Sequence, residues 1–227
     1  MNLLVVAAHP DDEILGCGGT MARLAREGHA IHIAILAEGI TSRYGQRERA
    51  DQSLVEALHE QGLRAAKLIG ARAMVIKDLP DNRLDTVPLL NVVKLVEELI
   101  RDFSPEAIYT HHGGDLNVDH AVVHRAVLTA TRPMQDQGVR EIYAFEVASS
   151  TDWAFQRFAP AFRPNVFVNI TETLATKVEA MSCYESETRE FPHPRSREAI
   201  EATARRWGAV VGCGAAEAFE LVRAVRL

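Results

Sequence analysis

LLVVAAHPDDEILGCGGTMA occupies residues 3–22 and indicates the architecture of the chain. Its first residues form a short apolar run, which is typical of a strand buried on both faces of a parallel sheet. Its last residues are glycines and small apolar residues that predict entry into a helix. A histidine and three acids lie between the two, so we expect them at the carboxyl end of a strand. Ligands bind at this edge of open α/β sheets.

Strand-like and helix-like segments alternate along most of the chain. After the first strand, further strands are predicted at residues 31–36, 71–76, 107–110 and 142–147. The segments between them have helical spacing of apolar residues. This alternation favours an α/β fold of the Rossmann-like kind, a mostly parallel sheet with helices on both faces. Because parallel crossovers are right-handed, the loops after the strands should meet at one edge of the sheet.

The last third of the chain is less regular. Residues 166–170 predict another strand, and residues 218–225 fit either a closing strand or a helix. We find no internal repeat, low-complexity tract or linker, which indicates one domain over residues 1–227.

Composition excludes several classes of protein. The chain has 227 residues, of which 47 % are hydrophobic, and a formal net charge of −6 without a basic block, which argues against binding to nucleic acid. No apolar run approaches the roughly 18 residues that cross a bilayer, and the amino terminus lacks a signal-peptide pattern. The cysteines are three and far apart, so no disulfide framework is expected. We therefore expect a cytoplasmic protein without a membrane partner. The sequence leaves open whether the protein forms a homo-oligomer.

A second group of polar side chains follows the strand predicted at residues 107–110. The segment HHGGDLNVDH, residues 111–120, holds three histidines, two acids and an asparagine. It should open at the same sheet edge as His9 and Asp12, so one of its histidines can join these two side chains. Three protein ligands and an open position for water are the arrangement of a catalytic zinc ion.

These motifs resemble those of a known family. The run His9-Pro10-Asp11-Asp12-Glu13 with the later pair Asp119-His120 is similar to the PIG-L (LmbE-like) family of zinc-dependent N-deacetylases. The resemblance covers most of the chain and implies a single deacetylase domain with one Zn²⁺. It implies that His9, Asp12 and His120 are the zinc ligands. It also implies that Asp11 is the general base that activates the metal-bound water.

The chain departs from the family pattern at Asn117. The family's second motif is commonly His-Pro-Asp-His, and its first histidine is assigned to the oxyanion and to protonation of the leaving amine. Asn117 can donate a hydrogen bond to an oxyanion but has no proton to transfer. Asp119 would orient the missing histidine and is kept as a candidate catalytic residue. The general acid stays open among Asp11, His112 and His193.

The loops at the predicted active edge supply candidate substrate-binding residues. They offer hydrogen-bonding groups for sugar hydroxyls and one indole that can stack on a sugar ring. These candidates are Arg43, Asp81, Asn82, Arg83, His112, Trp153 and His193. Each also fits a turn or the surface, and Trp153 fits the core equally well.

The expected function is therefore zinc-dependent hydrolysis of the acetamide of a small N-acetylated amino-sugar conjugate. Two alternatives stay open. One is a metal-dependent amidase or hydratase that acts on a non-sugar substrate, since the resemblance extends to such enzymes. The other is a nucleotide- or sugar-binding module that would use the glycines of residues 16–19 to hold phosphate.

Overall fold

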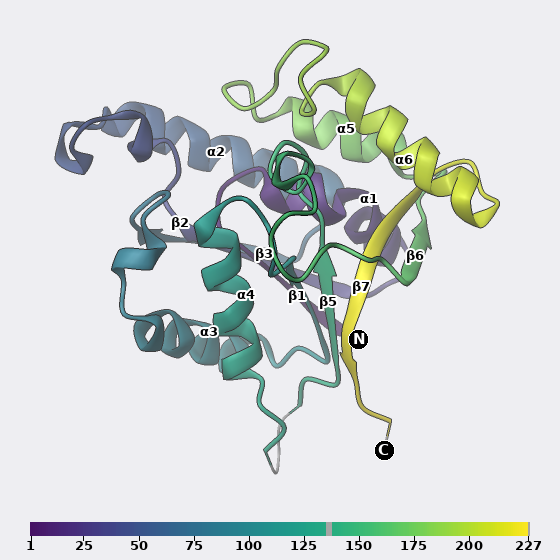
Figure 1. Ribbon diagram of the computed structural model, residues 1–227, viewed down its shortest axis with the longest axis horizontal. Helices are drawn as coiled ribbons and strands as arrows, with labels where there is room; N and C mark the ends of the chain where they lie inside the picture. Colours follow the sequence, from purple (N-terminus) through teal and green to yellow (C-terminus); the bar gives the residue numbers. More distant parts are fainter. Residues whose placement is uncertain (135–137, 227) are drawn as a thin grey trace.

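A computed structural model describes residues 1–134 and 138–226, whose strands form one seven-stranded sheet (Figure 1). The sheet order is β3-β2-β1-β4-β5-β7-β6. The parallel strands are β1 (Asn2–Ala7), β2 (Ala30–Ala37), β3 (Ala73–Leu79), β4 (Ala107–His111) and β5 (Glu141–Phe145). The strands β6 (Val166–Asn169) and β7 (Ala216–Ala224) add an antiparallel end. This arrangement confirms the predicted mostly parallel α/β fold.

Helices cover both faces of the sheet, as the alternation predicts (Figure 1). One hydrophobic cluster lies under α1 (Asp12–Arg26), α2 (Gln52–Ile69), α5 (Leu174–Ser182) and α6 (Arg197–Val211). A second cluster lies on the other face under α3 (Leu89–Phe103) and α4 (Val118–Ala130). Short 3₁₀ helices occur at Thr41–Arg43 (η1), Arg47–Arg49 (η2), Leu84–Thr86 (η3) and Asp152–Ala154 (η4).

One segment differs from its predicted form, and another that the sequence left open between strand and helix is a strand. The spacing of apolar residues predicts a helix from about residue 47 to residue 69, but α2 begins only at Gln52, because Asp51 caps it by accepting a hydrogen bond from the backbone N–H of Ser53 at 3.0 Å. The residues before this cap form η2 instead. The closing segment that fitted a strand or a helix is the strand β7, which pairs antiparallel with both β5 and β6.

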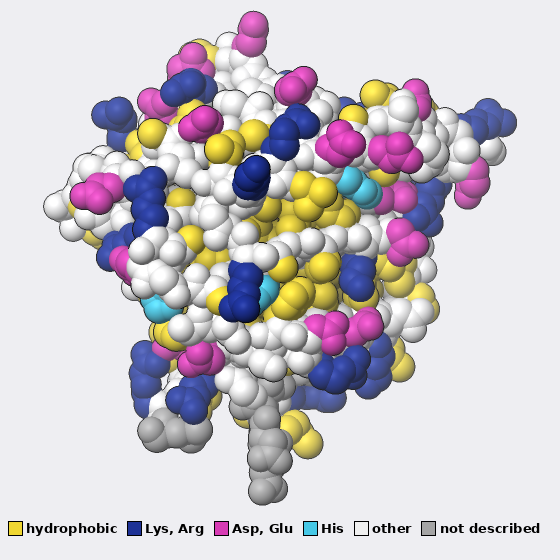
Figure 2. Space-filling model, turned by 180° about the vertical axis from the view of Figure 1, so that it is seen from behind, with side chains coloured by type: hydrophobic (Ala, Val, Ile, Leu, Met, Phe, Trp, Pro, Cys, Tyr) yellow, Lys and Arg dark blue, Asp and Glu magenta, His cyan; other side chains and the backbone are white. Residues whose placement is uncertain are grey.

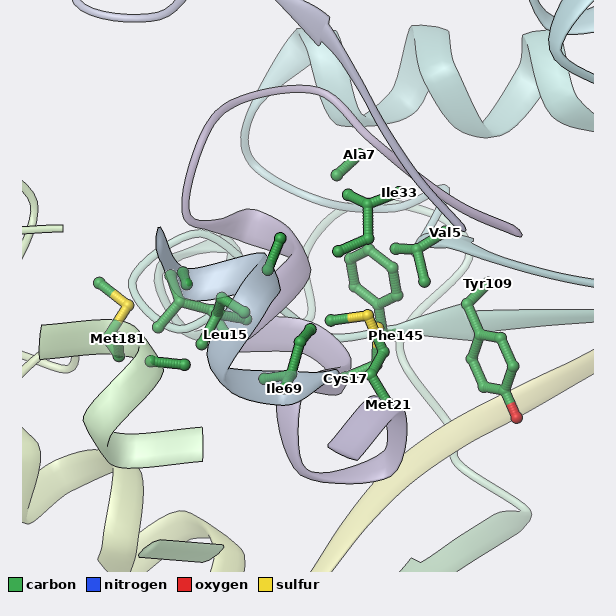
Figure 3. Close-up of a cluster of buried hydrophobic side chains, with 14 of the residues drawn as sticks. Val5, Ala7, Leu15, Cys17, Met21, Ile33, Ile69, Tyr109, Phe145 and Met181 are labelled. Carbon is green, nitrogen blue, oxygen red and sulfur yellow. The ribbon is translucent and has the colours of Figure 1, made fainter. Parts of the chain in front are cut away.

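The glycines of residues 16–19 serve packing. A Cβ atom at Gly16 would lie 2.3 Å from the ring of Phe145, and one at Gly19 would lie 2.7 Å from Ile170. Figure 3 shows the apolar cluster around Phe145 and Cys17 in which α1 packs on the sheet. The backbone N–H of Gly19 donates to Glu217 and is not free for phosphate. The structure therefore gives no support to the phosphate-binding alternative.

Helix α1 is kinked at Cys17, where φ is −146°. The carbonyl of Leu15 accepts a hydrogen bond from Lys177 Nζ at 2.8 Å. The carboxylate of Glu217 accepts from the N–H groups of Gly19 and Thr20 at 3.0 and 2.7 Å. Lys177 and Glu217 also form a buried ion pair at 2.6 Å. Lys177 on α5 and Glu217 on β7 thus form hydrogen bonds with the backbone groups that the kink leaves without a partner inside the helix.

The strand β3 forms one edge of the sheet, and Met74, Val75 and Ile76 are only partly buried. Figure 2 shows the face opposite to that of Figure 1, where hydrophobic side chains gather in a central hollow bordered by charged ones. The three cysteines, Cys17, Cys183 and Cys213, are free thiols. Among the described residues, no helix is both long and apolar enough to span a membrane.

Candidate active site

The two polar segments predicted at the sheet edge meet in the structure. Strands β1 and β4 are parallel neighbours, so the loops that follow them lie side by side. His9 Nδ1 and Asp12 Oδ2 are 3.1 Å apart, and His120 Nε2 lies 3.2 Å from the same oxygen. One ligand atom from each of these three side chains lies within 4.8 Å of the others, so the group could hold a metal ion.

The donor set fits a cation because two of its atoms are buried without a hydrogen-bond partner. Asp12 Oδ1 and His120 Nε2 are both in this state among the described residues. A buried polar atom without a partner is costly, and native structures rarely tolerate it. A metal ion would satisfy both atoms, and imidazole with carboxylate is a typical zinc donor set. His9, Asp12 and His120 therefore fit zinc.

The charges around this set favour a positive ion. Burial opposes protonation of His120, but Asp12 and Asp115 outweigh it and raise its pKa to about 9. Burial also acts against His9, whose pKa is nevertheless raised by its hydrogen bonds to Asp119 and Asp12. Burial raises the pKa of Asp12, but His120 and His111 outweigh this effect, and the pKa lies well below its usual range. In the metal-free protein, His9 and His120 therefore favour their protonated forms, and a metal ion would have to displace these protons to bind.

Two further carboxylates orient the rings of His9 and His120. Asp115 Oδ2 lies 2.9 Å from His120 Nδ1, and the hydroxyls of Ser150 and Thr151 donate to Asp115. Asp119 Oδ2 lies 3.0 Å from His9 Nε2, while its other oxygen accepts from a backbone N–H. A carboxylate behind each imidazole fixes the ring and raises its basicity as a ligand. Sequence reasoning assigned no role to Asp115, although it lies within the histidine-rich segment.

Asp11 is buried beside this set, at the amino end of α1. Its φ of 106° is unusual for a residue other than glycine, and its N–H donates to Glu13 Oε2 at 3.1 Å. Tyr184 in turn donates to Glu13 Oε1 at 2.6 Å, and burial raises the pKa of Glu13 to about 7. The Asp11 carboxylate accepts from Arg195. Burial raises the pKa of Asp11, and the charge of Arg195 opposes that rise.

Asn117 lies at the start of α4 and lines the cavity. Its Oδ1 accepts from the backbone N–H of Asp119 at 2.9 Å, which caps the helix. Its Nδ2 donates to Asn82 Oδ1 at 2.8 Å. Both ends of the amide therefore have a protein partner, and an oxyanion would have to compete with Asn82 for the donor.

A cavity of about 290 Å³ opens in front of His9 and Asp11. Of the predicted substrate-binding residues, Arg43, Asp81, Asn82, Trp153 and His193 line it. Trp153 is 44 % exposed, so its side chain is not in the core.

Two predicted substrate-binding residues do not line this cavity. His112 is buried and bonds to Glu220 and to the carbonyl of Pro160, away from the cavity, and Arg83 precedes η3. Further polar residues that were not among the predicted substrate-binding residues also line it, including Ser149, Glu187 and Arg195. They belong to no motif and reach the cavity only through the tertiary fold.

Fold and site together define an α/β protein with a buried histidine–carboxylate site at the carboxyl edge of its sheet. The sequence profile of the PIG-L family, described as GlcNAc-PI de-N-acetylase, matches residues 4–131, which is more than half of the chain. The chain belongs to this family.

Similar proteins include deacetylases and a hydratase. "Probable N-acetyl-alpha-D-glucosaminyl L-malate deacetylase 2" of Bacillus cereus is 29 % identical over 196 residues, which cover 82 % of this chain and 84 % of that protein. 4-Oxalmesaconate hydratase of Pseudomonas putida is 27 % identical over 192 residues, which cover 80 % and 72 %. The structure of N,N'-diacetylchitobiose deacetylase from Pyrococcus horikoshii shares the fold, with a TM-score of 0.78 at 16 % identity over 97 % of this chain and 83 % of that one.

Proposed function

We propose that the protein is a zinc-dependent N-deacetylase that releases acetate from a small N-acetylated amino-sugar conjugate. In this proposal His9, Asp12 and His120 hold one Zn²⁺. The observation that carries it is the pair of buried, unpartnered ligand atoms on Asp12 and His120, next to Asp11 at the base of a cavity. Membership of the PIG-L family supports amide hydrolysis as the reaction.

The proposed chemistry assigns a role to each polar side chain. A bound zinc ion would supply Lewis acidity that makes water nucleophilic at neutral pH. Asp11 takes a proton from the attacking water and returns it to the amine nitrogen as the C–N bond breaks, so one group serves as base and then as acid. Asp119 holds the ring of His9. Asn117 is the proposed hydrogen-bond donor to the acyl oxygen, exchanging Asn82 for substrate.

The cavity supports a polar substrate of small size. Its wall carries Arg43, Asp81, Asn82 and His193, which offer both donors and acceptors to hydroxyl groups. Trp153 is exposed at this wall, where an indole can stack on the face of a sugar ring. A volume of about 290 Å³ lies near the lower end of the range for small-molecule sites.

Acetate release is the direct test. The purified protein, loaded with one equivalent of zinc, is incubated with a panel of N-acetylglucosamine conjugates, and free acetate and free amine are measured. We expect both products in equal amounts from at least one conjugate, and none from Asp11→Asn carrying the same zinc. A panel that yields no acetate at any pH between 6 and 9 contradicts the proposal.

A hydratase is the second candidate, because the hydratase from Pseudomonas putida is similar over most of this chain. The same base could add water across an activated carbon–carbon double bond instead of an amide. Incubation with unsaturated dicarboxylic acids separates the two, since hydration removes ultraviolet absorbance and releases no acetate. Hydration without release of acetate would show that the protein is a hydratase and not a deacetylase.

A further inference from the structure

Arg195 lies in the wall of the cavity and contacts Asp11 across 184 residues of sequence. Its Nη1 donates to Asp11 Oδ2 at 2.6 Å, and its Nε donates to Ser149 Oγ at 3.0 Å. A second carboxylate oxygen, Oε2 of Glu187, lies 3.5 Å from Nη1. The Arg195 side chain is only 22 % exposed and that of Asp11 only 2 %. The guanidinium is therefore anchored on two of its edges.

The contact with Arg195 determines where the Asp11 carboxylate points. In the part of the chain that the structure describes, no other side chain forms a hydrogen bond with this carboxylate. The left-handed backbone of Asp11, held by Glu13, sets the direction of the Cα–Cβ bond. The guanidinium then restricts rotation about the side-chain bonds. The base is thus held at its backbone by one residue and at its carboxylate by another.

We infer, on the basis of the proposed function, that Arg195 is the positioning residue of Asp11 and acts on the reaction through this carboxylate. Arginine suits the task because its planar fork stays charged at all ordinary pH values and can bond two partners at fixed angles. Ser149 holds one edge of the fork, which leaves another edge for Asp11. A base displaced by about 1 Å can cost on the order of a hundredfold in rate.

The position of Arg195 in the chain makes this inference specific. The family profile matches residues 4–131, whereas Arg195 and Ser149 both lie outside that range. The ligand set and Asp11 lie within it. Residues outside the matched range therefore hold in place a proposed base, Asp11, that lies within it.

The kinetic test compares Arg195→Ala with Arg195→Lys and with a matched control. Arg195→Ala is expected to lower kcat by roughly ten- to a hundredfold, with KM changed less than about threefold and zinc content unchanged. Arg195→Lys keeps the charge without the fork and should lie between this variant and wild type. Free guanidinium should restore part of the activity of Arg195→Ala, whereas ammonium should not. Arg197→Ala removes an exposed arginine whose partner is Glu201 and should leave kcat unchanged.

A second measurement does not depend on activity. In the zinc-free protein, the Tm of Arg195→Ala, Asp11→Ala and the double variant forms a cycle. If the two side chains stabilise each other, the double variant should lose less Tm than the sum of the two single losses, by a few degrees. This non-additivity is expected even if the substrate is not an acetamide, so it separates failure of this inference from failure of the proposed function.

Two results would overturn the positioning role. One is a kcat of Arg195→Ala within twofold of wild type in protein that holds zinc. The other is additive Tm losses together with no response to guanidinium. If Arg195→Ala does not accumulate as folded protein, Arg195→Lys carries the decision, and a wild-type kcat in that variant contradicts the inference.

Discussion

The two walls of the cavity come from different parts of the chain and differ in construction. The inner wall is lined by His9 and Asp11, and the buried side chains of Asp12 and His120 lie next to His9. We count these four side chains as the inner wall; they lie on the segments that follow the adjacent strands β1 and β4. The outer wall holds side chains such as Trp153 and His193, which lie on loops and are partly exposed. Neighbouring strands of one sheet keep the inner side chains in a fixed relation, whereas loops can change in sequence without disturbing the sheet. The difference suggests that chemistry and substrate choice are divided between the walls.

The largest expected effect tests the inner wall as the metal site. His120→Ala should lose bound zinc and with it at least a thousandfold of activity, because it removes one of three ligands and breaks the contacts with Asp12 and Asp115. Metal content by elemental analysis and acetate release give the two readouts. Full zinc occupancy in the variant would show that the ligand set is misassigned.

The next largest effect separates ligand from base within the same wall. Asp11→Asn should keep its zinc and lose about a hundredfold or more of kcat, since it removes a proton acceptor and no ligand. The matched variant Asp12→Asn should instead weaken zinc binding. An Asp11→Asn protein that is zinc-loaded and close to wild type in rate would remove Asp11 from the mechanism.

The pH dependence of metal binding tests the charges of the inner wall. His120 must lose its proton to bind zinc, and its pKa in the metal-free protein is about 9. Below that pH, each unit of acidification should weaken zinc binding at least tenfold, or at least about a hundredfold from pH 8 to pH 6, because the pKa of His9 is raised as well and His9 must also lose its proton. Competition with a chelator of known pH dependence measures this. An affinity independent of pH in this range would mean that His120 is neutral before the metal arrives.

A smaller effect concerns Asn117, which lies where the two walls meet. Asn117→Ala removes both the α4 cap and the proposed oxyanion donor, so kcat should fall about ten- to a hundredfold. The pH–rate profile should keep its shape because no titrating group is lost. Asn82→Ala removes the present partner of the amide but keeps the proposed donor, so it should change KM, as expected for a residue of the cavity wall, and leave most of kcat. A normal kcat in Asn117→Ala would leave the residue with helix capping alone.

The smallest effect tests the outer wall. Trp153→Ala should raise KM by up to about tenfold and leave kcat nearly unchanged, because loss of stacking weakens substrate and transition state alike. Trp153→Phe retains an aromatic face and should recover part of the affinity. A fall in kcat of the same size as the rise in KM would show that the outer wall takes part in the chemistry. It would contradict the proposal that chemistry and substrate choice are divided between the two walls.

Sequence alone predicted that two polar segments meet at the sheet edge and named five outer-wall residues that line the cavity, but it did not predict the contacts between the outer wall and Asp11. The run at residues 3–22 combines a buried strand, a strand end and a helix start, so position and chemistry coincide in consecutive residues. The parallel alternation then brought residues 111–120 to the same edge, which the structure bears out. Asp115 was overlooked because its role depends on the direction of the His120 ring, which spacing does not reveal.

The contacts of Arg195 and Ser149 could not be predicted because both residues reach the cavity through long connections. Arg195 follows a loop after α5, and Ser149 follows β5, with no periodicity or motif that relates either one to Asp11. His112 was a reasonable candidate from its place after β4. It points instead to Glu220 on β7, a strand whose antiparallel direction the sequence did not specify.

The position of β7 has a consequence for the order in which the sheet can form. β7 lies between β5 and β6, although it follows both in the chain, so β6 has no sheet neighbour until β7 has been synthesised. Glu217 on β7 also accepts hydrogen bonds from the backbone of α1 just after its kink, about two turns beyond Asp12. A nascent chain that ends before β7 therefore carries the metal-binding motif on a helix that is not yet secured. The metal-binding site should therefore reach its final geometry only after β7 has been synthesised, although its proposed ligands are synthesised earlier.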